Sequence, residues 1–153
     1  MLTAQFAPPL TTREFGALLR AGVILGGLFV ALAYAVPRHT RRILAGVLVV
    51  AALVYVAFAA LAGASPRWLL LELLGVGVYG GLALRSLRGS MWWLAAAWAL
   101  HPVWDVALHY AGPGGAFAPT WWTVPCLSWD LVTAGWIAWR TIGKPAPVAR
   151  VGG

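Results

Sequence analysis

The sequence predicts an all-α membrane bundle of five transmembrane helices. Of its 153 residues, 61% are hydrophobic and only 10% are charged, with a mean hydropathy of +0.82. A soluble domain carries about 25% charged residues. The apolar residues also fall into five runs, and a run of about 20 such residues is long enough to cross a bilayer. The length suits a single domain, so we expect one integral-membrane domain over residues 1–153.

The first apolar run covers about residues 15–36. Thr11-Thr12-Arg13-Glu14, just before it, forms a pattern that can cap a helix. Arg20 lies near the start of the run, where its side chain can extend to the membrane interface. A cleaved signal peptide is an alternative, because Ala33-Tyr34-Ala35 resembles a cleavage site. Cleavage would leave the arginines that follow on the outside, however, so we favour a retained helix.

The next four runs are expected at about residues 43–64, 67–85, 91–110 and 119–140. The second run carries no charged side chain and fits a packing or lipid-facing helix. The third run carries Glu72 in its first half, followed by glycines of the kind that let membrane helices approach closely. A short uncharged loop joins the fourth and fifth runs, so we expect these two helices to be antiparallel neighbours.

The basic residues indicate orientation rather than nucleic-acid binding. The net charge is +7, but the basic side chains lie between the runs instead of forming one stripe. Eight fall in the first loop, the third loop and the tail, namely Arg38, Arg41, Arg42, Arg85, Arg88, Arg140, Lys144 and Arg150. The positive-inside rule then predicts an outer N-terminus and a cytoplasmic C-terminus in a bacterial inner membrane. The short tail, residues 141–153, is expected to be disordered.

Most of the tryptophans are expected near the ends of the runs. Six of the ten lie there, namely Trp92, Trp93, Trp121, Trp122, Trp136 and Trp139. Aromatic side chains at these places are typical of the belts that contact lipid headgroups. Trp98, Trp104 and Trp129 lie deeper, which makes them candidate neighbours of a buried site.

A cluster of ionisable residues lies inside the fourth run. At about 100° per helical residue, His101, Asp105 and His109 project from one face, with Trp98 on the same side. A charged side chain at the centre of a membrane helix costs about 2.5–3.5 kcal/mol on insertion scales. Such residues usually face the interior of a bundle, where they mark functional sites. We therefore take this face as the candidate site.

Depth along the helices predicts which residues meet. With a rise of about 1.5 Å per residue, His101 lies level with Asp130. Asp105 is then level with Cys126 and Glu72. Pro102 removes a helical hydrogen bond, so a kink there would open room beside His101. We expect a hollow between the third, fourth and fifth helices. Its predicted lining is His101, Asp105, Asp130 and Glu72, with His109, Cys126, Trp98, Trp104 and Trp129 around them.

The same residues resemble an uncharacterised family of small bacterial integral-membrane proteins. The core of the likeness is His101-x-x-Trp104-Asp105-x-x-x-His109, followed by Gly112 and by Cys126-x-x-x-Asp130, and it covers the chain from Pro37 onward. Arg41-Arg42, Trp68 with Glu72, and Gly81-Leu82 with Arg85-Ser86 extend it. Tyr110 stands where a second histidine often follows, and Trp129 where a second cysteine often stands, so paired-thiol chemistry is in doubt. The resemblance implies an architecture and a residue set but no reaction.

Three functions fit this cluster. Imidazole and carboxylates are ligands of transition metals, so His101, Asp105, Asp130 and Glu72 could hold a metal ion or serve a haem, with His109 at the mouth or on a second ion. His101, Asp105 and Asp130 could instead act as acid–base catalysts on a small apolar, lipid-like ligand, because a histidine beside carboxylates can transfer protons.

The third function is non-catalytic. Interhelical hydrogen bonds among these side chains would fix the order of the helices. The protein would then be an accessory subunit of a membrane complex or a homo-oligomer. The sequence alone does not decide between an enzyme and such a subunit. Cys126 is expected to be a buried thiol rather than a nucleophile.

Overall fold

The computed structural model describes residues 10–142, which form helices and no strand. The five α-helices are α1 (Thr12–Ala35), α2 (Thr40–Leu61), α3 (Pro66–Arg88), α4 (Trp92–Asp105) and α5 (Thr120–Thr141). Between α4 and α5 lie η1, a π-helix (Val106–Tyr110), and η2, a 3-10 helix (Pro113–Ala116). The all-α class is confirmed. The expectation of disorder in the tail falls almost entirely outside the described residues.

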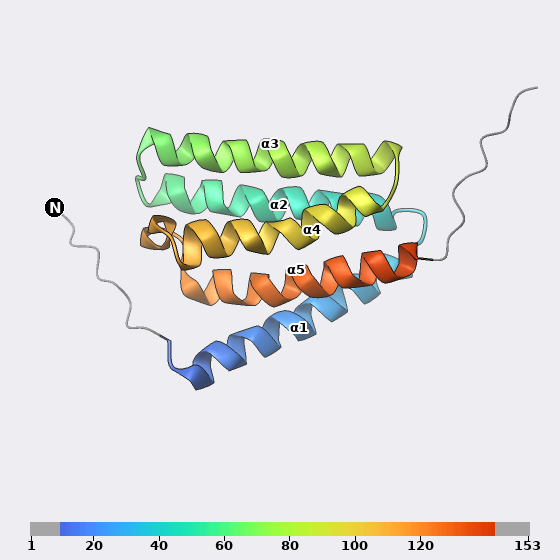
Figure 1. The fold of residues 1–153 in the computed structure, drawn as a ribbon, viewed down its shortest axis with the longest axis horizontal. Helices are drawn as coiled ribbons and strands as arrows, with labels where there is room; N and C mark the ends of the chain where they lie inside the picture. The colour runs from blue at the N-terminus through green and yellow to red at the C-terminus, as the bar shows by residue number, and fades with distance from the viewer. Residues whose placement is uncertain (1–9, 143–153) are drawn as a thin grey trace, which may run out of the picture.

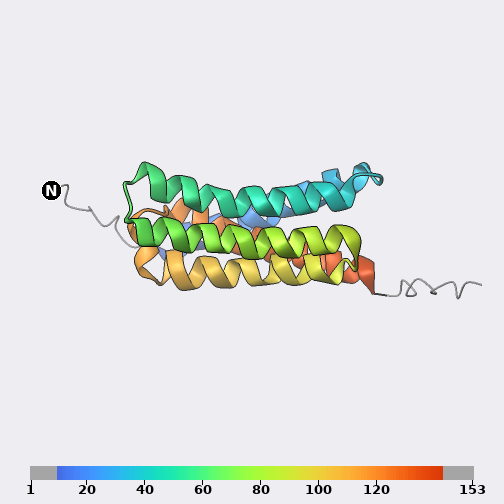
Figure 2. The ribbon, with the colours of Figure 1, turned by 90° about the horizontal axis from the view of Figure 1, so that it is seen from above.

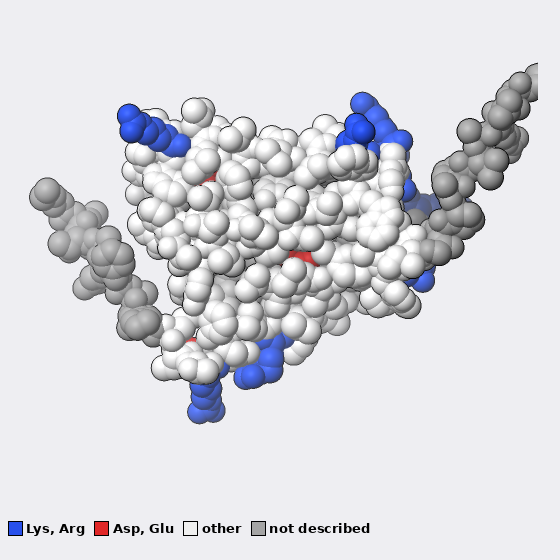
Figure 3. Space-filling model, viewed as in Figure 1, with Lys and Arg blue, Asp and Glu red and all other residues white. Residues whose placement is uncertain are grey.

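Three of the helices, α1, α2 and α3, are long and apolar enough to cross a membrane. α4 has only 14 α-helical residues before its backbone changes to η1. α5 has 22 residues, but Asp130 and several hydroxyl side chains interrupt its apolar sequence. The surface between the two ends is nearly free of charge on the face drawn in Figure 3. Five spans therefore stay a prediction for the bundle as a whole.

The helices do not pack in the order in which they follow one another along the chain. α1 packs on α5, α5 on α4, α4 on α3, and α3 on α2, with few contacts between α1 and α2. Figure 1 shows α1 crossing α5 at an angle, and Figure 2 shows α2, α3 and α4 running side by side. The predicted pairing of α4 with α5 as antiparallel neighbours is confirmed.

Local signals explain where the helices begin. The Thr11 hydroxyl accepts a hydrogen bond from the Glu14 amide at 3.2 Å, and the Glu14 carboxylate accepts one from the Thr11 amide at 2.9 Å. This reciprocal capping box starts α1, as predicted. Pro66 occupies the first turn of α3, where its missing N–H is not needed. Gly63 precedes it with a φ of +66°, a conformation that favours glycine.

One end of the bundle, called the basic end below, is where α1, α3 and α5 finish and α2 and α4 begin (Figure 1). It carries Arg38, Arg41, Arg42, Arg85, Arg88 and Arg140. The half of the bundle nearer this end has an apolar core of fully buried side chains from α2, α4 and α5, namely Leu44, Leu48, Leu94, Trp98 and Ile137. The polar residues described below begin at mid-depth and extend toward the opposite end.

The contact between α1 and α5 depends on two glycines one turn apart. A side chain at Gly22 would overlap the carbonyl oxygen of Pro125 and the hydroxyl of Ser128, and one at Gly26 would lie 3.0 Å from the Cα of Trp129. The Ser128 hydroxyl donates a hydrogen bond of 2.8 Å to the carbonyl of Leu19. Two glycines four residues apart thus bring the two backbones together, as in other membrane helix pairs.

We expect Gly22→Ala to destabilise the bundle by about 1–3 kcal/mol, because the added methyl group must push two backbones apart. The measurement is unfolding in mild-detergent micelles by titration with a denaturing detergent. Gly27→Ala is the matched control: Gly27 lies in the same helix with nothing within 4 Å of an added Cβ. Equal unfolding midpoints for the two variants would contradict this packing.

Candidate functional site

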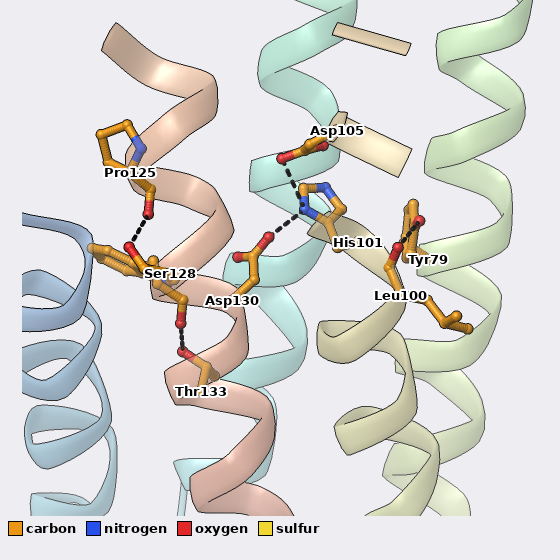
Figure 4. A network of polar contacts seen from close by, with 9 residues as sticks. Tyr79, Leu100, His101, Asp105, Pro125, Ser128, Asp130 and Thr133 are labelled. Atoms are coloured by element: carbon orange, nitrogen blue, oxygen red, sulfur yellow. Dashed lines mark hydrogen bonds and ion pairs between the residues drawn. The ribbon is translucent and has the colours of Figure 1, made fainter. Parts of the chain in front are cut away.

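Three ionisable side chains meet at the centre of the bundle: His101, Asp105 and Asp130, called the triad below. The Nδ1 atom of His101 lies 2.8 Å from Oδ2 of Asp130 and 3.6 Å from Oδ2 of Asp105. Figure 4 shows the two carboxylates converging on the same ring nitrogen. All three residues are at most 2% exposed. The triad therefore places two acids around one imidazole nitrogen inside the bundle.

The helices place these groups by simple periodicity. His101 and Asp105 are four residues apart on α4, so they lie on the same face. Asp130 comes from the facing helix, α5, and lies about 15 Å along it from Thr120 at 1.5 Å per residue. His101 lies about 13.5 Å from Trp92 at the start of α4 by the same count. The triad is thus at mid-depth, where an uncompensated charge is most costly.

A second buried pair lies closer to the end opposite the basic end. Nε2 of His109 is 2.9 Å from Oε1 of Glu72, and both residues are buried. The Tyr55 ring of α2 stacks on the His109 ring with centroids 4.0 Å apart and an interplanar angle of 12°. The Tyr55 ring is also 6.3 Å from that of His101, so Tyr55 stands between the triad and the second pair.

The sequence predicts Glu72 beside His101, Asp105 and Asp130, with His109 at the mouth of the site. In the structure the Glu72 carboxylate is hydrogen-bonded to His109 instead, and among the described residues the group of possible metal ligands consists of the triad alone. The backbone explains this difference. A single helix is predicted over residues 91–110, but the chain is α-helical only as far as Asp105 and forms a π-helix from Val106 to Tyr110.

The π-helix turns His109 toward Glu72. In a continuous α-helix, His109 would be rotated about 80° from His101. The amide of Ala111 instead bonds the carbonyl of Val106, five residues back, at 2.8 Å. A π-helical turn contains more residues than an α-helical one, so each residue rotates less and His109 stays nearer the face of His101 and Asp105. Gly112 lets the chain fold back here, because a side chain would strike the carbonyls of Ala107 and Leu108.

Several buried polar atoms around the site have no hydrogen-bond partner among the described residues. They include both carboxylate oxygens of Asp105, Nε2 of His101, Nδ1 of His109, the Tyr55 hydroxyl and the Trp98 indole nitrogen. Burying such groups without a partner is costly. Asp105 is the clearest case, because its contact with His101 at 3.6 Å is too long for a hydrogen bond. The chemistry of the site therefore calls for a further partner at Asp105.

In place of the expected hollow, the structure has a narrow gap beside His101 that is too small for a water molecule. Side chains from α2, α3 and α4 line it, among them Tyr55, Glu72, Tyr79 and His101. Trp104 closes one side by packing against Gly75. The hydroxyl of Tyr79 donates to the carbonyl of Leu100 at 3.2 Å (Figure 4), and its ring meets that of His101 edge-on. Residues of α2, α3 and α4 thus line the gap, whereas the sequence predicts a hollow between α3, α4 and α5.

The other predicted neighbours lie at different distances from the site. Cys126 is a free, half-buried thiol one turn before Asp130, and it is outside the group of possible metal ligands. Trp98 is fully buried in the apolar core. Trp129 stacks on Phe29 of α1, with ring centroids 5.2 Å apart. Of the three deep tryptophans, only Trp104 lines the gap.

Tyr55 and Tyr79 both line the gap, yet neither is among the site residues predicted from the sequence. The second apolar run carries no charged side chain and is therefore expected to be a packing or lipid-facing helix. A tyrosine hydroxyl inside an apolar run also needs a polar partner when it is buried, and that signal could have drawn attention to both residues.

We expect Glu72 and His109 to stabilise the fold as a pair. Glu72→Ala or His109→Ala alone leaves a buried partner unpaired, which costs about 3–5 kcal/mol. The double variant should lose at least about 1 kcal/mol less than the sum of the single losses. The measurement is again unfolding in micelles. A control cycle pairs Glu72→Ala with Ser86→Ala, since the buried Ser86 hydroxyl bonds only Ala83 of its own helix. Additive losses for Glu72 and His109 would refute the pairing.

Comparison with known proteins assigns the chain to a family. The family model described as a family of unknown function (DUF6010) matches residues 18–144. These residues include most of α1 and all of α2 to α5, and therefore both the triad and the second pair. The chain matches no curated protein and no solved structure. The expectation of an uncharacterised family is confirmed: the chain belongs to the family of unknown function DUF6010.

Proposed function

We propose that this protein binds one divalent transition-metal ion at the triad, in the middle of a five-span membrane bundle. The observation that carries the proposal is the donor set: one imidazole and two carboxylates, fully buried, with ligand atoms within 4.8 Å of one another. The unpartnered oxygens of Asp105 supply the second support.

Charge balance favours an ion at this place. Two ionised carboxylates and a neutral imidazole carry a charge of −2, which a low-dielectric interior does not tolerate without compensation. A divalent cation makes the group neutral overall and would be the largest local charge. It would also give the Asp105 carboxylate a partner, since neither of its oxygens has a hydrogen bond within the described part of the chain. Imidazole and carboxylate together suit zinc, iron and manganese better than softer ions.

The distances are consistent with one ion. Ligand atoms at about 2.0–2.2 Å from a metal lie no more than about 4.4 Å apart. The ligand atoms of the triad lie within 4.8 Å of one another, and two of the distances are 2.8 Å and 3.6 Å, so small rotations of the side chains would bring all three atoms within this limit. Three protein ligands also leave a coordination position open, which distinguishes catalytic sites from closed structural ones.

The space around the triad favours an ion over a larger ligand. Pockets for small molecules usually measure about 300–1,000 Å³, whereas the gap beside His101 has no room even for a water molecule. A haem or a lipid-like substrate would need the helices to separate. Of the expected ligands, we therefore propose a metal ion rather than a haem or an apolar, lipid-like molecule.

The polar residues suggest a side of access. Asp105, Tyr55, Glu72 and His109 extend from the triad toward the end opposite the basic end, while Leu48 and other apolar side chains fill the basic half. An ion would thus enter from the end opposite the arginines. The positive-inside rule places the arginines in the cytoplasm, so the opposite end and the N-terminus would face outward. The proposed location is the inner membrane.

A structural network is the second candidate, favoured by the direct hydrogen bonds His101–Asp130 and His109–Glu72. In that function His101 would be protonated, Asp130 ionised and Asp105 neutral, and no ion would be needed. The two candidates differ in the role of Asp105: it is a ligand in the first and has no bonding partner in the second.

We expect about one metal ion per chain in protein purified in neutral detergent without chelators, measured by elemental mass spectrometry. His101→Ala, Asp105→Asn and Asp130→Asn should each reduce the metal content at least about tenfold, because removing a ligand from a three-ligand site weakens binding strongly. After exchange with Co²⁺, the wild-type protein should show a visible absorption spectrum that these variants lack.

Two controls accompany this measurement. Cys126→Ser and Glu72→Gln should keep the metal, because neither residue belongs to the triad. Metal-free wild-type protein that remains metal-free after incubation with Zn²⁺, Mn²⁺ and Co²⁺ would refute the metal site. In that case, destabilisation by Asp130→Asn, which disrupts the His101–Asp130 contact, would support the structural network.

The proposed topology predicts which ends react with an impermeant thiol reagent in intact cells. In a Cys126→Ser background, Ala116→Cys in the exposed turn before α5 should be labelled from outside. Ser90→Cys, exposed at the basic end, should be labelled only after the cells are opened. The reverse result would invert the topology and place the access side in the cytoplasm.

A further inference from the structure

A hollow at the basic end carries two arginines and a tryptophan. It measures about 530 Å³ and lies at the turn from α3 to α4, where Gly81, Leu84, Arg85, Arg88, Gly89 and Trp93 line it. This volume falls within the range of about 300–1,000 Å³ that is usual for ligand sites. We propose that the hollow binds the headgroup of an anionic glycerophospholipid, whose phosphate pairs with Arg85 and Arg88.

The arrangement of Arg85 suits a phosphate. Its guanidinium lies over the Trp93 ring, 4.5 Å from the centroid. A guanidinium stacked in this way keeps the N–H groups at its edge free to bond two phosphate oxygens at once. The stacking also limits the motion of a long side chain, so less conformational entropy is lost when the ligand binds.

Arg85 and Arg88 are not occupied in closing the end of α3. That role belongs to Arg41 of α2, whose guanidinium donates to the carbonyls of Ser86 and Gly89 at 3.0 and 3.1 Å. The last carbonyls of a helix need such donors, and Arg41 provides them from outside. The charges of Arg85 and Arg88 are thus directed to the surface of the bundle, where both residues are exposed.

The chain offers these arginines no acidic side chain. It has only four acidic residues. Glu14 caps α1 at the opposite end, and Glu72, Asp105 and Asp130 are buried in the bundle. The charge of the hollow must therefore be balanced by something outside the protein. The surface of a membrane with anionic lipids is the nearest source of negative charge to a helix end at this depth.

The surface beside the hollow favours a lipid over free phosphate. Leu84 and Leu87 are exposed next to the arginines. Farther along α3, Gly77, Gly80 and Gly81 have open space around them. An acyl chain could lie along this flat, apolar strip while the phosphate stays at the arginines. A soluble phosphate would gain only the charged contacts.

The test measures lipid binding to the full chain in neutral detergent by native mass spectrometry, with phosphatidylglycerol and phosphatidylcholine of the same acyl chains as probes. The wild type should prefer phosphatidylglycerol. The Arg85→Gln, Arg88→Gln double variant should bind it roughly 30-fold more weakly, about fivefold for each arginine, since one basic residue near an anionic surface contributes about 1 kcal/mol. Its weak binding of phosphatidylcholine should not change.

The matched control is the Arg13→Gln, Arg67→Gln double variant, which loses the same charge at the opposite end and should keep the preference. If both double variants lose the same affinity for phosphatidylglycerol, the effect is one of total charge and the proposed site is wrong. Equal binding of the two lipids by the wild type would also overturn the site. Free glycerol phosphate that binds as tightly as the lipid would overturn the assignment to a lipid.

Unfolding of the Arg85→Gln, Arg88→Gln variant in lipid-free micelles shows whether the substitutions disturb folding. If they do, the second variant is Trp93→Leu, which removes the aromatic ring under Arg85 but no charge. It should weaken phosphatidylglycerol binding as well.

Discussion

The burial of three acids in an apolar bundle is the constraint on which the rest of this structure depends. Each carboxylate at mid-depth must have a proton, a hydrogen-bond donor or a cation nearby, because water is not available. Asp130 and Glu72 each have a histidine. Asp105 has none of its own, since His101 is closer to Asp130. The imbalance between three carboxylates and two imidazoles is what makes a cation at the triad the best account of the site.

The same constraint explains how the helices are arranged around the site. α4 and η1 together contribute three of the five ionisable side chains, and α4 lies between α3 and α5, which supply Glu72 and Asp130. α2 reaches the site through Tyr55 and Ala52, and α1 touches α5 on the far side. The apolar half of the bundle holds these helices at fixed spacing, so the polar half can keep its distances. Packing in the apolar half therefore determines the distances between the polar side chains in the other half.

Much of this structure could be predicted from sequence because it depends on short-range rules. The capping residues of α1, the five helical segments and the shared face of His101 and Asp105 follow from composition and periodicity. Depth counting also paired His101 with Asp130. It did not predict the pairing of Glu72 with His109, because the π-helix after Asp105 changes the rotation and the rise per residue. A π-helix has no reliable sequence signal, and it is stabilised here by tertiary contacts with the turn that follows.

The role of α1 could not be read from local sequence for a related reason. Gly22 and Gly26 matter only because α5, about a hundred residues later, presents Pro125 and Ser128 to Gly22 and Trp129 to Gly26. This contact has a consequence for biosynthesis. While the chain is being made, α1 is synthesised before the other described helices but meets its main partner, α5, only after α2, α3 and α4 have been made. Until then its two glycines are uncovered, and another helix or an assembly factor could occupy the same face. The bundle is thus closed by a late event that joins the earliest described helix to the latest.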